Sequence, residues 1–198
     1  MNTKTINTKQ HILEVGYHLV SKKGFTGMGL SELLKAAGIP KGSFYHYFQS
    51  KEQFGETLLR RYFDQYLARV ELLFQSSEGN HYQNLMRFWQ YWVENNRYLC
   101  DSGQCLVVKL ASEVSDLSES MRQVLTTGTR QAVHLIAVCI EQGKQAGDIQ
   151  VNDSQAMAEH LYEYWLGACL MNKIHQDDQS LERALVRTER LLQGTRPL

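Results

Sequence analysis

The sequence predicts an all-α fold with a small N-terminal three-helix bundle followed by a larger helical domain. The chain has 198 residues, 43% of them hydrophobic, and only two prolines. Apolar residues recur at helical spacing, and no stretch alternates strictly enough for a convincing strand. This length allows one large domain or a small domain joined to a larger one. The second arrangement fits better, with domains at 1–50 and 51–198.

Three helices are predicted at the N-terminus. The first runs from a Thr8 cap to Gly24. Its buried face consists of Ile12, Leu13, Tyr17, Leu19 and Val20. The second helix spans 31–37 and ends at Gly38, and Pro40 opens the third, where its missing amide proton costs nothing. This order predicts a helix-turn-helix motif. The residues predicted to pack between its two helices are Leu30, Leu33, Leu34, Phe44 and Phe48.

The outward face of the third helix suits a DNA major groove. Its N-terminal end attracts phosphate, and its basic and hydroxyl-bearing side chains can reach base edges. A glycine on this face leaves room for a backbone to come close. The residues of this face are Lys41, Gly42, Ser43, Tyr45, His46 and Tyr47.

The formal charge of the chain is zero, but the charges are unevenly distributed. Residues 1–51 contain seven lysines and two glutamates, a net charge of +5, so the remaining residues carry −5. A basic head on an acidic body is typical of a DNA-binding protein, because phosphate neutralisation supplies most of the sequence-independent affinity. Lys51, which starts the next helix, is a predicted phosphate contact.

A long helix is predicted to join this head to the rest of the chain. Ser50 and Gln53 form a capping box, and apolar residues at helical spacing continue to about Gln75. Because one helix connects both parts, movement of its far end is expected to be felt at Lys51 and Tyr47.

An aromatic helix is predicted from about His81 to Cys100, after a loop at 76–80. Its aromatic residues occupy more than one face, which suits core packing or the lining of an apolar ligand cavity. Both alternatives stay open on the sequence alone. The candidate pocket residues are Trp89, Trp92, Lys109 and Trp165.

The chain contains four cysteines, and none is spaced as in a zinc site, so all are expected to be free thiols. Cys105 follows a predicted break at 101–104 and stands at the start of the next predicted helix. The unpaired amides and the dipole of a helix start stabilise a thiolate, which makes Cys105 a candidate reactive thiol. An inert buried cysteine is the alternative.

Two more long helices are predicted towards the C-terminus. One covers 117–145 and ends at Gly147, and the next is capped by Asp153 or Ser154 and continues to about Ile174. The second is apolar on several sides. Such a helix is either central to its own domain or shared with a partner.

The motifs of the head resemble those of the TetR family of transcriptional regulators. KGSFYHYF at 41–48, followed by Ser-Lys-Glu at 50–52, is similar to the recognition helix and the next helix start of that family. With the later segments SGQCLVVKLASEVSDLSESMR and YWLGACLMNKI, the chain resembles the electrophile- and redox-sensing branch of the family over nearly its whole length.

The resemblance implies a homodimeric repressor of a palindromic operator, with a C-terminal domain for ligand sensing and dimerisation. It implies that Thr26 and Gly27 contact the sugar-phosphate backbone of the DNA. It also implies a sensor at Cys105 with Lys173 nearby, and a small reactive electrophile or oxidant as inducer. Ser115 stands where the branch can carry another cysteine, so a disulfide switch through that position is not available. The last two predicted helices are assigned to the dimer interface, with purely intramolecular packing as the alternative.

Other classes of function are poorly supported. The sequence has no phosphate-binding glycine loop, metal-spaced His/Cys set or nucleophile elbow, so no enzyme activity, cofactor or metal is expected. A repressor induced by an unreactive apolar ligand and a thiol-dependent enzyme are the alternatives. The polar N-terminal segment and the lack of a long apolar run predict a cytoplasmic protein that does not contact a membrane.

Overall fold

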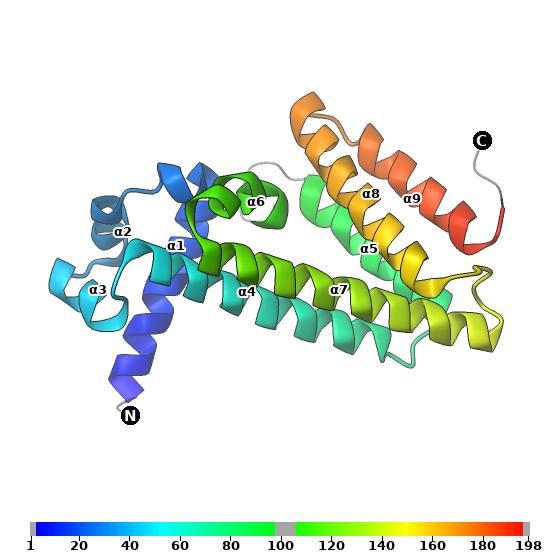
Figure 1. Cartoon of the computed structure of the whole chain (residues 1–198), viewed down its shortest axis with the longest axis horizontal. Helices are drawn as coiled ribbons and strands as arrows, with labels where there is room; N and C mark the ends of the chain where they lie inside the picture. The colour runs from blue at the N-terminus through cyan, green and yellow to red at the C-terminus, as the bar shows by residue number, and fades with distance from the viewer. Residues whose placement is uncertain (1–2, 98–105, 196–198) are drawn as a thin grey trace. The chain divides into compact units, whose positions relative to one another are not determined.

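A computed structural model of the chain describes residues 3–97 and 106–195, and every regular element within these ranges is a helix (Figure 1). The helices are α1 (Thr3–Gly27), α2 (Leu30–Ala37), α3 (Lys41–Tyr47), α4 (Lys51–Phe74), α5 (His81–Arg97), α6 (Leu106–Leu117), α7 (Glu119–Ala146), α8 (Ser154–His175) and α9 (Gln179–Leu192). The all-α prediction is confirmed. None of these described helices is long and apolar enough to cross a membrane.

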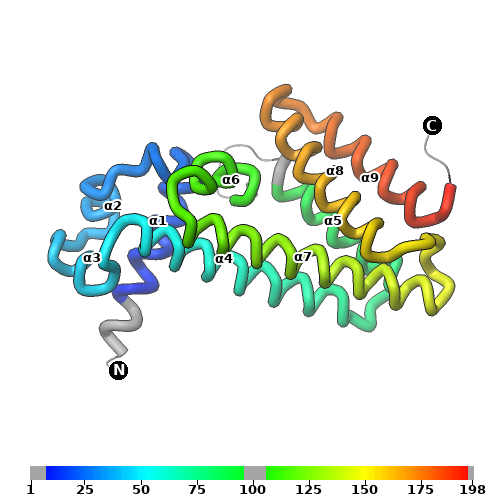
Figure 2. Tube along the Cα trace, viewed as in Figure 1, coloured from blue at the N-terminus to red at the C-terminus, as the bar shows by residue number. Residues whose placement is uncertain are grey.

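The chain forms two compact units. The first contains the residues up to Asp64 together with Leu106–Thr126, and the second contains the rest. Helices α4 and α7 therefore each contribute to both units, as their course in Figure 2 shows. The packing also places α6 in the same unit as the N-terminal head. A division of the chain at residue 50 would assign α6 to the other domain.

Helix α1 differs from its prediction at both ends. It begins at Thr3, so Thr8 lies inside the helix instead of capping it, because no glycine or proline precedes Thr8 to stop the helix. Gly24 breaks the helical geometry as expected, with φ 80° and ψ 172°. A short helical turn then continues to Gly27. The Gly24 backbone conformation is open almost only to glycine.

The helix-turn-helix motif is confirmed in α2 and α3. Gly38 ends α2 in the left-handed conformation, with φ 63°, and the amide of Ile39 donates to the Leu34 carbonyl. Pro40 has ψ 154°, so it is the N-cap of α3 and not its first helical residue. The Pro40 carbonyl accepts a hydrogen bond from the Ser43 amide, which makes Lys41 the first residue of the helix.

A cluster of three phenylalanines holds α3 and α4 together. The ring centroids of Phe44 and Phe48 are 5.2 Å apart, and those of Phe48 and Phe54 are 5.3 Å apart. All three side chains are buried. A Cβ atom on Gly16 of α1 would lie 2.2 Å from the tip of the Phe54 ring. The missing side chain at Gly16 therefore provides the space in which Phe54 packs.

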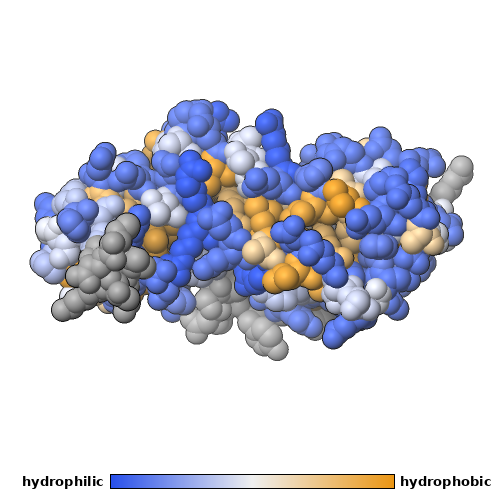
Figure 3. Space-filling model, turned by 90° about the horizontal axis from the view of Figure 1, so that it is seen from below, coloured by the Kyte–Doolittle hydropathy of each residue, from blue (hydrophilic) through white to orange (hydrophobic). Residues whose placement is uncertain are grey.

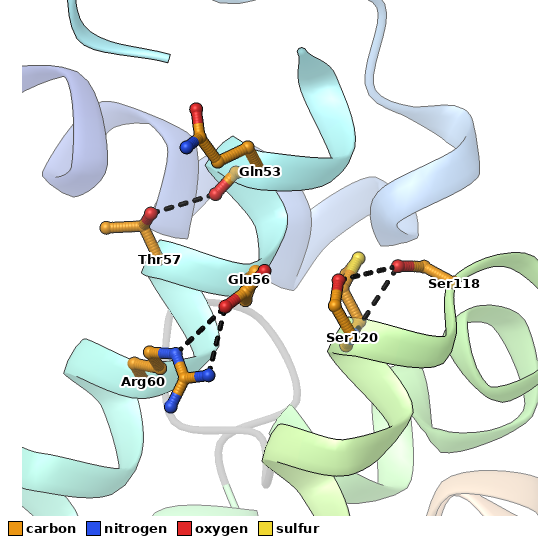
Figure 4. A network of polar contacts seen from close by, with 7 residues as sticks. Gln53, Glu56, Thr57, Arg60, Ser118 and Ser120 are labelled. Carbon is orange, nitrogen blue, oxygen red and sulfur yellow. Dashed lines mark hydrogen bonds and ion pairs between the residues drawn. The ribbon is translucent and has the colours of Figure 1, made fainter. Parts of the chain in front are cut away.

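The start of α4 confirms the predicted cap with one change. The Ser50 hydroxyl accepts a hydrogen bond from the Gln53 amide at 3.1 Å, but the Gln53 side chain accepts from the Gln49 amide. One turn later, Arg60 donates to Glu56 through two nitrogens (Figure 4). These local contacts make a regular first two turns for α4.

Helix α7 begins two residues later than predicted. The Ser118 hydroxyl accepts a hydrogen bond from the Met121 amide at 3.4 Å and lies 3.1 Å from the Ser120 hydroxyl (Figure 4). Because Ser118 caps the helix, Leu117 belongs to the end of α6.

The second unit contains an aromatic core between α5 and α8. The rings of Trp89 and Trp165 are stacked with centroids 4.8 Å apart and an interplanar angle of 9°. The Trp165 indole nitrogen donates to the Thr188 hydroxyl on α9 at 2.9 Å. At the start of α8, Asp153 accepts the Ala156 amide, so the predicted cap is confirmed.

Helix α9 is not among the elements predicted from the sequence. Its buried residues follow helical spacing and are Ser180, Leu181, Ala184, Thr188 and Leu192. The same spacing in the sequence was the available signal. Charged and polar residues occupy the remaining positions, so the segment is strongly one-sided and its helical periodicity could have been recognised from the sequence.

We expect Gly24→Ala to destabilise the first unit more than Gly38→Ala. At Gly38 a Cβ would meet nothing within 4 Å, so the substitution carries only the left-handed backbone cost, about 1–2 kcal/mol. At Gly24 the backbone conformation, with φ 80° and ψ 172°, costs a residue with a Cβ up to about 3 kcal/mol, and the Cβ would also displace the Glu113 carboxylate from Thr26. Urea unfolding midpoints of the two variants test the difference. Equal midpoints would contradict it.

Candidate DNA interface and sensor thiol

Helix α3 presents the predicted DNA-reading face to solvent. Lys41, Tyr45 and His46 are exposed, whereas Ser43 and Tyr47 are half-buried. The Lys41 ammonium lies 5.8 Å from the centroid of the Tyr45 ring. No atom lies within 4 Å of where a Cβ on Gly42 would stand, so this position is open to an approaching backbone. The exposure of this face supports its predicted role, which stays a prediction.

Lys51 lies over the ring of Phe25, with its ammonium 4.8 Å from the ring centroid. Partial burial lowers the pKa of Lys51, and the nearby carboxylates of Glu52 and Glu113 partly oppose this shift. The aromatic face and the two carboxylates position the ammonium at the start of α4. It is therefore a preorganised cation next to the recognition helix.

The donors of Thr26 already have an internal partner. Its backbone N–H and its hydroxyl both donate to the same oxygen of Glu113 on α6, at 3.0 and 2.7 Å. Both groups are donors that a DNA phosphate could use. Thr26 and Gly27 are exposed, as their predicted phosphate contacts require. Glu113 was not among the predicted site residues, because its partner is 87 positions away in the sequence.

The pKa of the Glu113 carboxyl is lowered. Burial acts to raise this pKa, but hydrogen bonds from the backbone and hydroxyl of Thr26 and from the Phe25 backbone outweigh it. Nearby Lys109 lowers it further. Glu113 is thus held as a carboxylate among groups that also suit a phosphate.

The predicted sensor Cys105 lies outside the described residues, as does Cys100. Its place in the chain is directly before Leu106, the first residue of α6. Lys173, its predicted neighbour, is half-buried in the last turn of α8. A contact between the two remains a prediction.

The two described cysteines are both buried. The Cys139 thiol lies 3.6 Å from the His81 carbonyl, and burial raises its pKa to about 12. A thiol with this pKa is almost entirely protonated at neutral pH, and the thiolate is the nucleophile. Cys139 therefore has the character of an inert core cysteine.

The three predicted pocket tryptophans pack against one another. Trp89 and Trp165 are fully buried and Trp92 nearly so, which is the core-packing alternative. Lys109 belongs to the first unit, where its ammonium donates to the Lys22 carbonyl at 3.3 Å. A ligand pocket built from these four residues stays a prediction.

A groove of about 540 Å³ lies in the second unit between α7 and α8. Its lining is Thr129, Arg130, Val133, Gln155, Glu159, Tyr162, Glu163 and Leu166. None of the predicted pocket residues takes part. In the part of the chain that the structure describes, no group of His, Cys, Asp and Glu residues could hold a metal ion.

Two sequence families match the chain. The family described as "Bacterial regulatory proteins, tetR family" matches residues 12–57, and "Tetracyclin repressor-like, C-terminal domain" matches residues 82–187. The two matches cover the head and most of the remaining chain.

Several characterised relatives are similar over most of the chain. The HTH-type transcriptional repressor NemR of Escherichia coli K12 is 40% identical over 190 residues, which is 94% of each chain. The transcriptional regulator AcuR of Cereibacter sphaeroides is 33% identical over 172 residues, 83% of this chain and 76% of AcuR. A crystal structure of the reduced form of E. coli NemR matches with a TM-score of 0.90 and 41% identity, covering 94% of this chain and 97% of that one.

We expect Lys51→Met to weaken binding to all duplex sequences alike. The methionine keeps an apolar stem on Phe25 but removes the cation, so the slope of log affinity against log salt should fall by about one. Fluorescence anisotropy with a randomised duplex pool across a salt series measures the slope. Lys144→Met, on α7 in the second unit, removes the same charge and should leave the slope unchanged. An unchanged slope in Lys51→Met would remove this residue from the interface.

Tyr45→Phe should relax sequence preference at one position of each half-site. Tyr45 is 47% exposed on the outward face of α3, and losing a hydroxyl that pairs with a base costs roughly 1–3 kcal/mol. Selection from a randomised duplex pool shows the change in preference. Tyr91→Phe is the matched control, because Tyr91 is 45% exposed on α5. An identical selected sequence for Tyr45→Phe and the wild type would show that its hydroxyl reads no base.

Proposed function

This chain belongs to the TetR family of transcriptional regulators, and from that premise we propose that it is a homodimeric repressor which releases a palindromic operator when an electrophile or oxidant modifies Cys105. The observation that carries this proposal is the position of α6. This helix starts directly after Cys105 and reaches the DNA-binding head through the Glu113–Thr26 hydrogen bonds. A change in the first turn of α6 thus has a short physical route to a predicted phosphate contact.

The proposed chemistry needs one accessible thiolate. A cysteine at a helix start has its thiolate stabilised by unpaired amides and by the helix dipole. With an activated alkene, the sulfur forms a new bond to carbon, and a proton from water completes the adduct. The modification removes a negative charge and adds bulk next to α6.

The two cysteines that the structure describes are poor candidates for the sensor, and this supports Cys105 in that role. Cys139 and Cys169 are buried in the second unit, and burial disfavours the charged form of a thiol. Similarity to NemR, which was crystallised in a form described as reduced, also supports a redox-sensitive regulator.

We place part of the dimer interface on α8. Its C-terminal half exposes Leu170, Met171 and Ile174, and α9, which packs against α8, exposes Val186. A different face, seen from below the view of Figure 1, also carries hydrophobic patches among hydrophilic residues (Figure 3). Helical pairs that expose apolar residues in this way commonly form four-helix interfaces between two copies. The predicted partner helix α7 contributes exposed Val138.

Cys105→Ser should bind the operator with normal affinity and fail to release it when treated with N-ethylmaleimide, methylglyoxal or hypochlorite. Serine is similar in size to cysteine, but its hydroxyl stays protonated at neutral pH and does not react as the thiolate does. Gel-shift titration of the operator selected from a randomised duplex pool, with and without each reagent, gives the readout. Cys100→Ser, Cys139→Ser and Cys169→Ser are the controls and should respond like the wild type. Full release by Cys105→Ser, with loss of response in a control, would move the sensor to another thiol.

A further inference from the structure

The turn at residues 24–26 has the form of an anion-binding site. Gly24, which has no Cβ, has φ 80° and ψ 172°, and the backbone N–H of Thr26 donates to a carboxylate oxygen of Glu113 at 3.0 Å. The Phe25 backbone also acts on this carboxylate and lowers its pKa. Consecutive amides arranged in this way form a concave site for anions, as in phosphate-binding loops. The Thr26 hydroxyl adds a third donor.

The anion in this site is the carboxylate of Glu113. One of its oxygens accepts both donors of Thr26, and the space where a Gly24 side chain would stand holds the other, 2.2 Å from the ideal Cβ position. The carboxylate also acts electrostatically on the ammonium of Lys51. Glu113 thus engages two residues that are predicted to contact DNA phosphates.

We propose that Glu113 is an internal mimic of a DNA phosphate, and that operator binding and the Glu113–Thr26 contact exclude each other. The inference rests on the proposed phosphate contact of Thr26. A phosphate needs the same Thr26 donors, and a carboxylate left beside it would repel it. The engaged carboxylate therefore belongs to the released state of the repressor.

The contact also gives α6 a direct role in release. Glu113 lies two turns into the helix that begins after Cys105. A displacement of α6 along or about its axis changes whether the carboxylate reaches Thr26. Modification of Cys105 would then lower operator affinity by favouring the engaged position, since a ligand shifts an equilibrium only by its preference for one state.

The test compares Glu113→Gln with Asp116→Asn in the full-length protein. Asp116 is an exposed carboxylate on the same helix, so both variants remove one negative charge from α6. Both are measured against the duplex selected from a randomised pool by the wild-type protein. We expect Glu113→Gln to bind about 3- to 10-fold more tightly than Asp116→Asn and to release less on treatment with N-ethylmaleimide. Equal affinity in the two variants, or weaker binding by Glu113→Gln, would overturn the proposal.

Thr26→Val in the Glu113→Gln background separates the two claims. With the carboxylate gone, the substitution measures the contact of the Thr26 hydroxyl with DNA, because valine keeps the backbone N–H. Unchanged affinity there would show that the hydroxyl makes no contact with DNA, and it would remove the hydroxyl part of the premise of the inference. Reduced affinity there, combined with no gain from Glu113→Gln alone, would overturn the phosphate mimic and leave the DNA contact intact. Thermal unfolding of each variant confirms that the compared proteins are folded.

Discussion

Packing of the Phe54 ring against the bare backbone of Gly16 is the constraint on which the DNA-binding head depends. A Cβ at Gly16 would lie 2.2 Å from that ring, so the ring can pack on α1 only because the side chain is absent. Phe44 and Phe48 complete the cluster and fix α3 on the same core. Because one face of α3 is held by these rings, its opposite face is presented to solvent with defined side chains. Tightly packed interiors transmit displacement, so we expect movement of α4 to be felt at the recognition helix.

The charges of the head are arranged around this packed core. Seven lysines in the first 51 residues give it a basic character, but Glu113 brings a carboxylate from α6 to Thr26 and near Lys51. Against the effect of burial, hydrogen bonds from Thr26 lower the pKa of the Glu113 carboxyl, so the folded state favours its charged form. Thr26 thus has its donors satisfied internally, and on the proposed mechanism DNA binding exchanges this carboxylate for a phosphate.

The second unit has a different physical character. Its centre is a stack of aromatic rings from α5 and α8, and the Trp165 indole is tied to α9 through Thr188. Buried aromatic clusters of this kind contribute large apolar area and define one packing arrangement. Both described cysteines are buried, and burial raises the pKa of the Cys139 thiol to about 12. Reactivity is accordingly expected at the helix start after residue 104, outside this core.

The sequence by itself determined the helical class, the helix-turn-helix, the caps at Ser50 and Asp153, and the exposed face of α3. Those features depend on local propensity, capping and periodicity, which a single chain displays directly. Only the tertiary structure decided that α6 joins the head and that Glu113 binds Thr26, because charge and spacing do not indicate which residues 87 positions apart will meet. It also showed that the three tryptophans are buried against one another, which aromatic spacing alone does not indicate, since that spacing suits a core and a cavity equally. Local patterns specify elements, whereas contacts between distant elements arise only when the whole chain packs.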